Sequence, residues 1–133
     1  MSRPRLVQRF DNQDYAKVLV GWCDSDHAGC IRTRKSTSGA TILFGKHELM
    51  HYCRGQAVIA LSSGEAEYYS LVSLVSELLG IQAITRDWNL DCQLSANMDA
   101  TAGMGIASRR GLGKLKHVHT VFSGRKSKSL LAE

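Results

Sequence analysis

Acidic residues follow the most apolar stretch of the chain. The segment Val18 to Cys23, VLVGWC, is predicted to form a buried strand that runs directly into Asp24 and Asp26. A strand of Val, Leu and Trp is favourable to bury, whereas a carboxylate at its end is costly to bury unless a cation receives it. The later acidic positions of the chain make most sense as partners of this strand end.

Three further acids, at the ends of two other predicted elements, could complete a site with Asp24. Glu65 and Glu67 lie at the start of a predicted helix, and Asp99 follows a predicted strand. Carboxylates gathered at one edge of a sheet repel one another, and hard oxygen ligands of this kind select Mg²⁺ or Mn²⁺. Two such ions about 4 Å apart can hold the attacking and leaving oxygens of a phosphodiester. The pattern suggests a two-metal site, although each acid taken singly is more simply a cap or a solvated charge.

The two glutamates are expected to have different roles. Ser62 and Glu65 form a capping box, a Ser followed three residues later by Glu, which opens a helix. Glu65 and Glu67 are about 200° apart around a helix axis, so they cannot both face one metal. Glu67 is predicted to be the ligand and Glu65 the cap, because Glu67 continues an apolar stripe expected to face the sheet. The stripe consists of Leu71, Leu74 and Leu78.

The elements that must position these acids are predicted as an α/β mixed sheet with flanking helices. Strands are expected at 17–23, 38–44 and 48–53, joined by connections short enough for an antiparallel meander. A helix from Ser62 to about Ile81, a strand at 93–98, a weak helix at 100–108 and a strand at 115–122 follow. The predicted domain covers 17–122, after a lead-in at 1–16 and before an atypical tail at 123–133. Trp22 is expected to pack in the core.

Length and composition narrow the class of protein. The chain has 133 residues, which suits one domain, and 44% are hydrophobic and 22% charged, as in ordinary globular proteins. No apolar run approaches the roughly 20 residues that span a bilayer, and the basic N-terminus lacks an apolar signal core. The four cysteines form no CxxC pair, so mostly buried, reduced thiols are expected. An intracellular protein that is not secreted and does not enter a membrane is predicted.

The positive charge is concentrated in the last quarter of the chain. The net charge is +5, and no acidic residue occurs from Ala100 to Ala132, which holds seven of the 17 Lys and Arg residues. A basic segment of this kind suits a polyanionic partner such as nucleic acid. A solvated, partly disordered tail is the alternative, which composition alone slightly favours. The candidate phosphate-binding residues are Arg109, Arg110, Lys114 and Lys116.

Five segments between about Val18 and His119 carry recognisable motifs. They are GWCDSDHAG, RKSTSGATILFG, LSSGEAEYYSL, MDATAG and LKHVH. Together they resemble the ribonuclease H domain of copia-type retrotransposon polyproteins, and they occur in the order of that family. The combination of DSD-x-AG, R-KSTSG and LSS-x-EAEY is specific to this family.

The resemblance implies the ribonuclease H-like α/β fold and metal-dependent hydrolysis of the RNA strand of RNA–DNA hybrids during reverse transcription. It places the family's catalytic acids on Asp24, Glu67 and Asp99, with Mg²⁺ or Mn²⁺ as the cofactor. Asp26 is the second acid of the DxD-like motif and is expected to support the site. The implied partners are the hybrid and an upstream reverse transcriptase domain, in the cytoplasm or nucleus.

The chain also departs from the pattern of that family. The family carries a fourth acid after the Lys-His pair, and here His119 stands at that position. Histidine is a poor Mg²⁺ ligand compared with a carboxylate, so plain loss of the acid is the first interpretation and His119 as a substitute that carries a proton is the alternative. The tail SGRKSKSLLAE lacks the apolar period of the expected amphipathic helix, and His27 replaces the usual Trp.

Two rival functions follow from these departures. One is a catalytically impaired relic with the same fold, which binds nucleic acid through its basic segment without cleaving it efficiently. The other is a transposase or integrase of the DDE type, which uses similar two-metal chemistry. The order Asp, Glu, Asp in this chain suits ribonuclease H better than two Asp followed by Glu.

Overall fold

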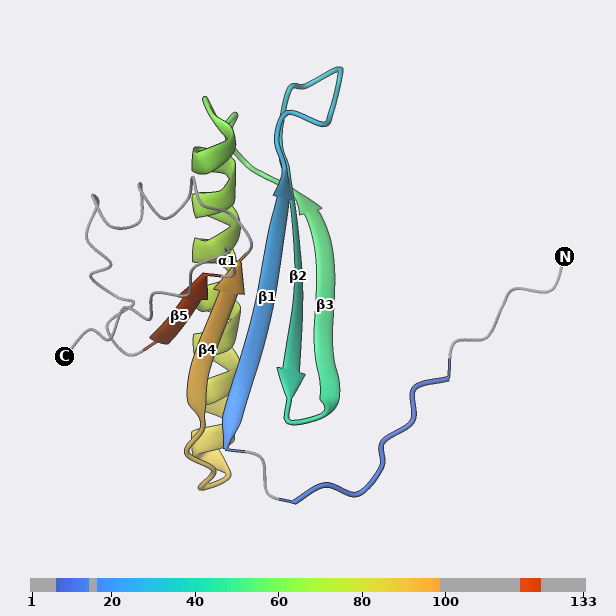
Figure 1. Cartoon of the computed structure of the whole chain (residues 1–133), viewed down its shortest axis with the longest axis vertical. Coiled ribbons are helices and arrows are strands. Elements are labelled where there is room, and N and C mark those ends of the chain that lie inside the picture. The colour runs from blue at the N-terminus through green and yellow to red at the C-terminus, as the bar shows by residue number, and fades with distance from the viewer. Residues whose placement is uncertain (1–6, 15–16, 99–117, 123–133) are drawn as a thin grey trace, which may run out of the picture.

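A five-stranded sheet with one long helix forms the domain (Figure 1). The computed structural model describes residues 7–14, 17–98 and 118–122, the last range by its backbone only. The sheet order is β3-β2-β1-β4-β5. The elements are β1 (Val18–Asp26), β2 (Thr37–Phe44), β3 (His47–Gly55), α1 (Ser63–Asp87), β4 (Gln93–Met98) and β5 (Val118–Phe122).

The pairing of the strands is mixed, as the sequence predicts. β1, β2 and β3 form an antiparallel meander, because their connections are too short for any other arrangement. β4 pairs parallel with β1, and β5 pairs parallel with β4. The crossover from β3 to β4 runs through α1, which covers one face of the sheet (Figure 1).

The core lies between α1 and this face of the sheet. Leu71, Leu74 and Leu78 are fully buried, so the predicted apolar stripe of the helix is confirmed. Leu74 packs directly over Gly21 of β1, where a Cβ atom would lie 2.6 Å from Leu74 Cδ1. A side chain at this position would push the helix and the sheet apart.

Gly21→Ala is therefore expected to lower the free energy of unfolding by about 1–3 kcal/mol, the range for overpacking a tight core. The decrease in the free energy of unfolding is measured by denaturant unfolding of the variant and the parent. Gly55→Ala at the end of β3 is the matched control, because no atom lies within 4 Å of a Cβ built there. Equal stability of the two variants would contradict this packing of α1.

Three elements are longer than predicted by more than one residue. β3 spans His47–Gly55 in place of 48–53. β1 continues through Asp24 to Asp26, because these residues still pair with β2. α1 continues past Gly80 to Asp87, six residues beyond the predicted end at Ile81. The buried Gln82 donates from Nε2 to Cys92 O at 2.6 Å. This tertiary contact outweighs the roughly 1 kcal/mol that a helical glycine costs.

Other predictions are met only in part. Cys23 and Cys92 are buried free thiols, but Cys30 and Cys53 are exposed. Residues 7–14 of the predicted lead-in have no regular secondary structure. The predicted helix at 100–108 and the tail at 123–133 lie outside the described residues. Among the described helices, none is long and apolar enough to cross a membrane.

Candidate active site

Asp24 directly follows the last described pair of the parallel strands β1 and β4. This pair joins Cys23 to Met98, and the pairing of β1 with β2 continues to Asp26. The Asp24 side chain is exposed, and its Oδ1 accepts a hydrogen bond from Ser25 N at 2.8 Å. This orients a carboxylate at the carboxyl end of a parallel strand pair, which is the usual place for a site in a sheet with parallel strands.

The Ser62 half of the predicted capping box forms at the start of α1, whereas the Glu65 carboxylate accepts from Leu61 N instead of from the N-cap backbone. Ser62 is the N-cap, and its Oγ accepts from Glu65 N at 3.2 Å. Glu65 Oε2 accepts from Leu61 N at 2.8 Å, and its Oε1 accepts from Tyr69 Oη at 2.9 Å. Both carboxylate oxygens of Glu65 are thus engaged in holding the helix start, which agrees with the structural role expected for it.

Glu67 lies one turn before the contact that joins α1 to the Asp24 strand end. Ser70 Oγ donates to the backbone oxygen of Asp24 at 2.9 Å. Residues three apart share a helix face, so Glu67 and Ser70 project from the same side of α1. The half-buried Glu67 is therefore positioned toward the end of β1 that carries Asp24.

The pKa of the buried Cys23 thiol depends on the charges of both carboxylates. Burial raises the pKa of Cys23 to about 11, a hydrogen bond with Ser70 lowers it, and the charges of Asp24 and Glu67 raise it further. A carboxylate affects a buried thiol in this way only over a short range. The charges of Asp24 and Glu67 thus both act on the thiol that lies between β1 and α1.

Asp26 takes a different position. A Cβ atom built on Gly29 would overlap Asp26 Oδ2, so this carboxylate lies against the backbone of its own loop. Its position favours a role in shaping the loop between β1 and β2. A side chain at position 29 would make the Asp26 carboxylate move.

Two buried or partly buried polar contacts of this site could not be inferred from the sequence. The first is Ser70, whose hydroxyl fixes α1 to β1. The second is Gln56, whose Nε2 donates to Ser38 Oγ at 2.9 Å and to Ala66 O at 2.8 Å. Gln56 thereby ties the first turn of α1 to β2. No sequence spacing of a Ser or a Gln predicts hydrogen bonds to partners so distant in the chain.

Two of the three predicted metal ligands, Asp24 and Glu67, lie in the described part of the chain. Within the described residues, no group of three or more His, Cys, Asp or Glu side chains is placed to hold a metal ion. The oxygens of Asp24 and Glu67 are the kind that Mg²⁺ and Mn²⁺ prefer. The third predicted ligand, Asp99, directly follows Met98 in the sequence but lies outside the described residues.

The remaining predicted residues are described only in part. His119 lies within β5, where its backbone is level with Ser95 of β4. Ser95 is three residues before the end of β4, or about 10 Å at the usual rise per strand residue. This register gives no support to His119 as a replacement for the missing acid. The predicted phosphate-binding residues Arg109, Arg110, Lys114 and Lys116 lie outside the described residues.

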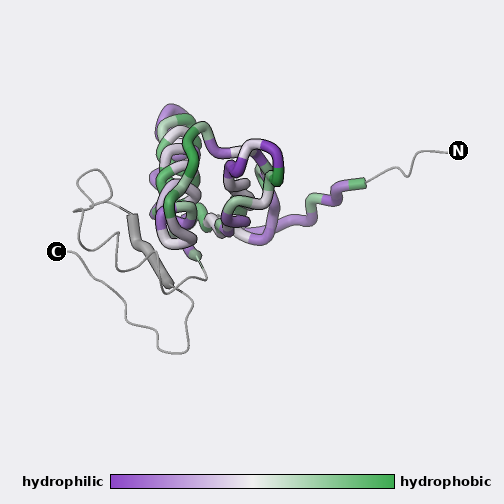
Figure 2. Tube along the Cα trace, turned by 90° about the horizontal axis from the view of Figure 1, so that it is seen from above, coloured by the Kyte–Doolittle hydropathy of each residue, from purple (hydrophilic) through white to green (hydrophobic). Residues whose placement is uncertain are grey.

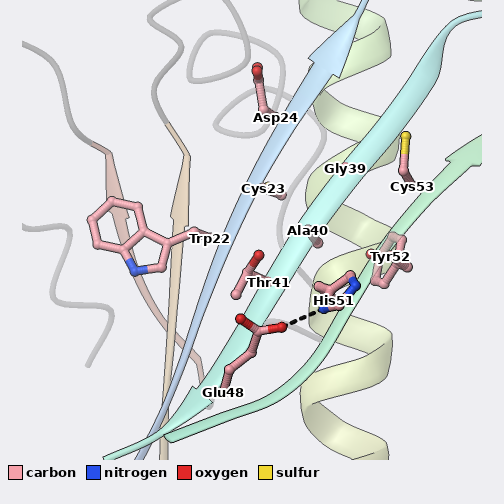
Figure 3. A pocket seen from close by; sticks show the side chains of 10 residues that line it. All are labelled: Trp22, Cys23, Asp24, Gly39, Ala40, Thr41, Glu48, His51, Tyr52 and Cys53. Carbon is pink, nitrogen blue, oxygen red and sulfur yellow. Dashed lines mark hydrogen bonds and ion pairs between the residues drawn. The ribbon is translucent and has the colours of Figure 1, made fainter. Parts of the chain in front are cut away.

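Trp22 is not a core residue, contrary to the prediction. Its side chain is 48% exposed, because alternation along β1 places it on the face of the sheet opposite α1. Figure 3 shows this face, with Trp22, Thr41 and His51 in front of α1. Trp22 and Asp24 line the same open trough, of about 570 Å³. His51 Nδ1 and Glu48 Oε1 form a hydrogen bond within it.

Comparison with known proteins gives partial sequence matches. No protein-family model matches the chain. It is 39% identical over 60 residues to an uncharacterised mitochondrial protein of Arabidopsis thaliana, covering 45% of this chain and 25% of that protein. A match to the secreted RxLR effector protein 161 of Plasmopara viticola has 35% identity over 68 residues and covers 51% and 48%. The chain is also 30% identical over 73 residues to the retrovirus-related Pol polyprotein from transposon TNT 1-94 of Nicotiana tabacum, covering 55% and 6%.

The chain therefore spans less than half the length of these relatives. Among solved structures, it is similar to LC11 ribonuclease H1, isolated from compost by a metagenomic approach. The TM-score is 0.50 and the identity 15%, over 72% of this chain and 62% of that one. The chain thus has the ribonuclease H-like fold that its sequence predicts. Similarity at this level of identity concerns the fold, and the activity is a separate question.

Proposed function

We propose that the chain is a metal-dependent endonuclease that hydrolyses the RNA strand of RNA–DNA hybrids. The observation that carries this proposal is the hydrogen bond from Ser70 Oγ, one helical turn after Glu67, to the backbone oxygen of Asp24. Both acids affect the same thiol, Cys23, from two different elements. A ribonuclease H-like fold with acids at this end of the sheet suits phosphodiester hydrolysis.

Asp24, Glu67 and Asp99 would hold the Mg²⁺ or Mn²⁺ ions. Such ions supply a water nucleophile at neutral pH and neutralise charge on the phosphate. The chain itself contributes the fixed positions of the carboxylates. Ser25 N donates a hydrogen bond to one oxygen of Asp24. Ser70 binds the backbone of β1, and Gln56 binds the first turn of α1. These two contacts hold α1, and with it Glu67, in place relative to β1.

The biological setting is part of the proposal. The similarity to a Pol polyprotein from a transposon supports a copia-type retrotransposon origin. In that setting the domain acts inside the cell, on hybrids made by an upstream reverse transcriptase domain of the same polyprotein.

One observation favours a second candidate, a nucleic-acid-binding relic with little activity. His119 occupies the place of the fourth acid of the family, and the register of β5 does not favour its use as a replacement. The loss of one ligand weakens a metal site without removing it. The two candidates differ in whether cleavage occurs at all.

The test is a cleavage assay with the RNA strand of a hybrid labelled. Cleavage in Mg²⁺ or Mn²⁺ that stops on addition of EDTA is the expected result. The same strand alone and the same sequence as double-stranded DNA should not be cut at a comparable rate. Binding of the hybrid without cleavage in either metal would refute the nuclease proposal and support the nucleic-acid-binding relic.

A further inference from the structure

A basic loop extends beyond the end of the sheet where Asp24 lies. It joins β1 to β2 and is closed by hydrogen bonds from Cys30 N to Lys35 O at 3.3 Å and from Arg34 N to Cys30 O at 2.7 Å. Ala28 N also donates to Ser36 Oγ at 3.1 Å, so both ends of the loop are tied together. The loop is therefore a defined structure, and it projects from the top of the sheet in Figure 1.

Three cations lie within four consecutive positions of this loop, Arg32, Arg34 and Lys35. Both arginines are exposed, and Lys35 is half-buried. Within the described part of the chain, none of the three forms an ion pair with an acid, whereas Arg9, Arg54 and Arg86 do. Figure 2 views the molecule from this end and shows hydrophilic residues in the loop. The charges of this loop are thus available to a ligand.

The loop is fixed on the same side of the molecule as the candidate active site. It leaves β1 at Asp26, two residues after Asp24. Its His27 Nε2 is 3.3 Å from Ala60 O, in the segment that leads to the cap of α1. The loop therefore connects the strand end that carries Asp24 with the helix start that precedes Glu67.

We propose that Arg32, Arg34 and Lys35 bind phosphates of the nucleic-acid duplex whose RNA strand reaches Asp24 and Glu67. This inference rests on the proposed function. Uncompensated cations on a fixed loop beside a phosphodiester site match the spaced negative charges of a duplex backbone. The contacts are to phosphate, so they are independent of sequence and sensitive to salt. They are separate from the basic segment at 109–116.

The test compares two triple variants of the full chain. Arg32→Gln/Arg34→Gln/Lys35→Gln removes the loop charges. Lys17→Gln/Lys46→Gln/Arg86→Gln is the matched control, with the same change in charge at the opposite end of the sheet. Binding of a fluorescein-labelled RNA–DNA hybrid is followed by anisotropy in EDTA, where no cleavage occurs, over a series of salt concentrations.

The loop variant is expected to bind at least about 10-fold more weakly and to reduce the slope of log K against log salt by about 2–3. The control variant should retain most of the affinity and the slope. Arg32→Gln alone, at a position with ordinary backbone geometry, should reduce the slope by about 1. Circular dichroism and thermal melting establish that each variant is folded.

The outcomes separate this inference from the proposed function. If the loop variant binds like the parent, or if both triple variants lose affinity equally, the inference is wrong even when the parent cleaves the hybrid. If the parent binds the hybrid but never cleaves it, and the loop variant alone loses binding, the inference stands and the nuclease proposal fails.

Discussion

Asp24→Asn is expected to lower the rate of RNA-strand cleavage by at least about 100-fold. Loss of a group that only supports a metal ligand already reduces affinity or activity by 10–100-fold, and the ligand itself should matter more. The amide keeps the size of the carboxylate and can still accept the hydrogen bond from Ser25 N. It lacks the charge that a divalent cation requires. The rate should be measured in Mg²⁺ and Mn²⁺ on the hybrid used above.

Asp26→Asn is the matched control for this variant. It makes the same chemical change two residues further along β1, at a side chain that lies against Gly29. Its cleavage rate should stay within about 10-fold of the parent rate, the lower limit for a supporting group. Thermal melting should find both variants folded. If Asp26→Asn loses activity and Asp24→Asn keeps it, the assignment of the metal ligand is reversed.

Glu67→Gln is the second substitution with a large expected effect. It should also lower cleavage by at least about 100-fold, because it removes the one carboxylate that α1 brings to the Asp24 strand end. The helix should be unaffected, since Gln has a helix propensity similar to that of Glu. Measurement of cleavage at increasing Mn²⁺ concentration would show whether excess metal partly restores the rate.

The neighbouring acid provides an internal comparison for Glu67. Glu65→Gln should cleave at close to the parent rate, because Glu65 holds Leu61 N and Tyr69 Oη at the helix start. It should instead lower the free energy of unfolding by about 0.3–1 kcal/mol, through loss of a negative charge at the helix N-terminus. Equal loss of cleavage in both glutamate variants would mean that the helix start as a whole, rather than Glu67, controls the activity.

These variants would also decide between the nuclease and the relic. A relic should bind the hybrid through its cations. Its parent chain should not cleave the hybrid, so Asp24→Asn and Glu67→Gln would have no activity to lose. A nuclease without the fourth acid should show cleavage that depends on both residues. The comparison uses the parent chain, in which His119 is unchanged.

The local features of this chain were determined by the sequence itself. The capping box at Ser62 and Glu65 needs only residues three apart, and the apolar stripe that contains Leu74 follows from the helical period. The antiparallel meander follows from short connections. These features depend on neighbours in the chain, so they could be predicted without knowledge of the fold.

Other features were decided by the tertiary structure, because they depend on residues far apart in the chain. The hydrogen bond from Ser70 to Asp24 joins positions 46 apart, and it fixes the helix that carries Glu67 to this strand end. The continuation of α1 past Gly80 depends on the contact of Gln82 with Cys92. Trp22 is exposed because α1 covers only the other face of the sheet. Pattern and spacing identify which residues can do chemistry, whereas packing across the sheet decides which of them meet.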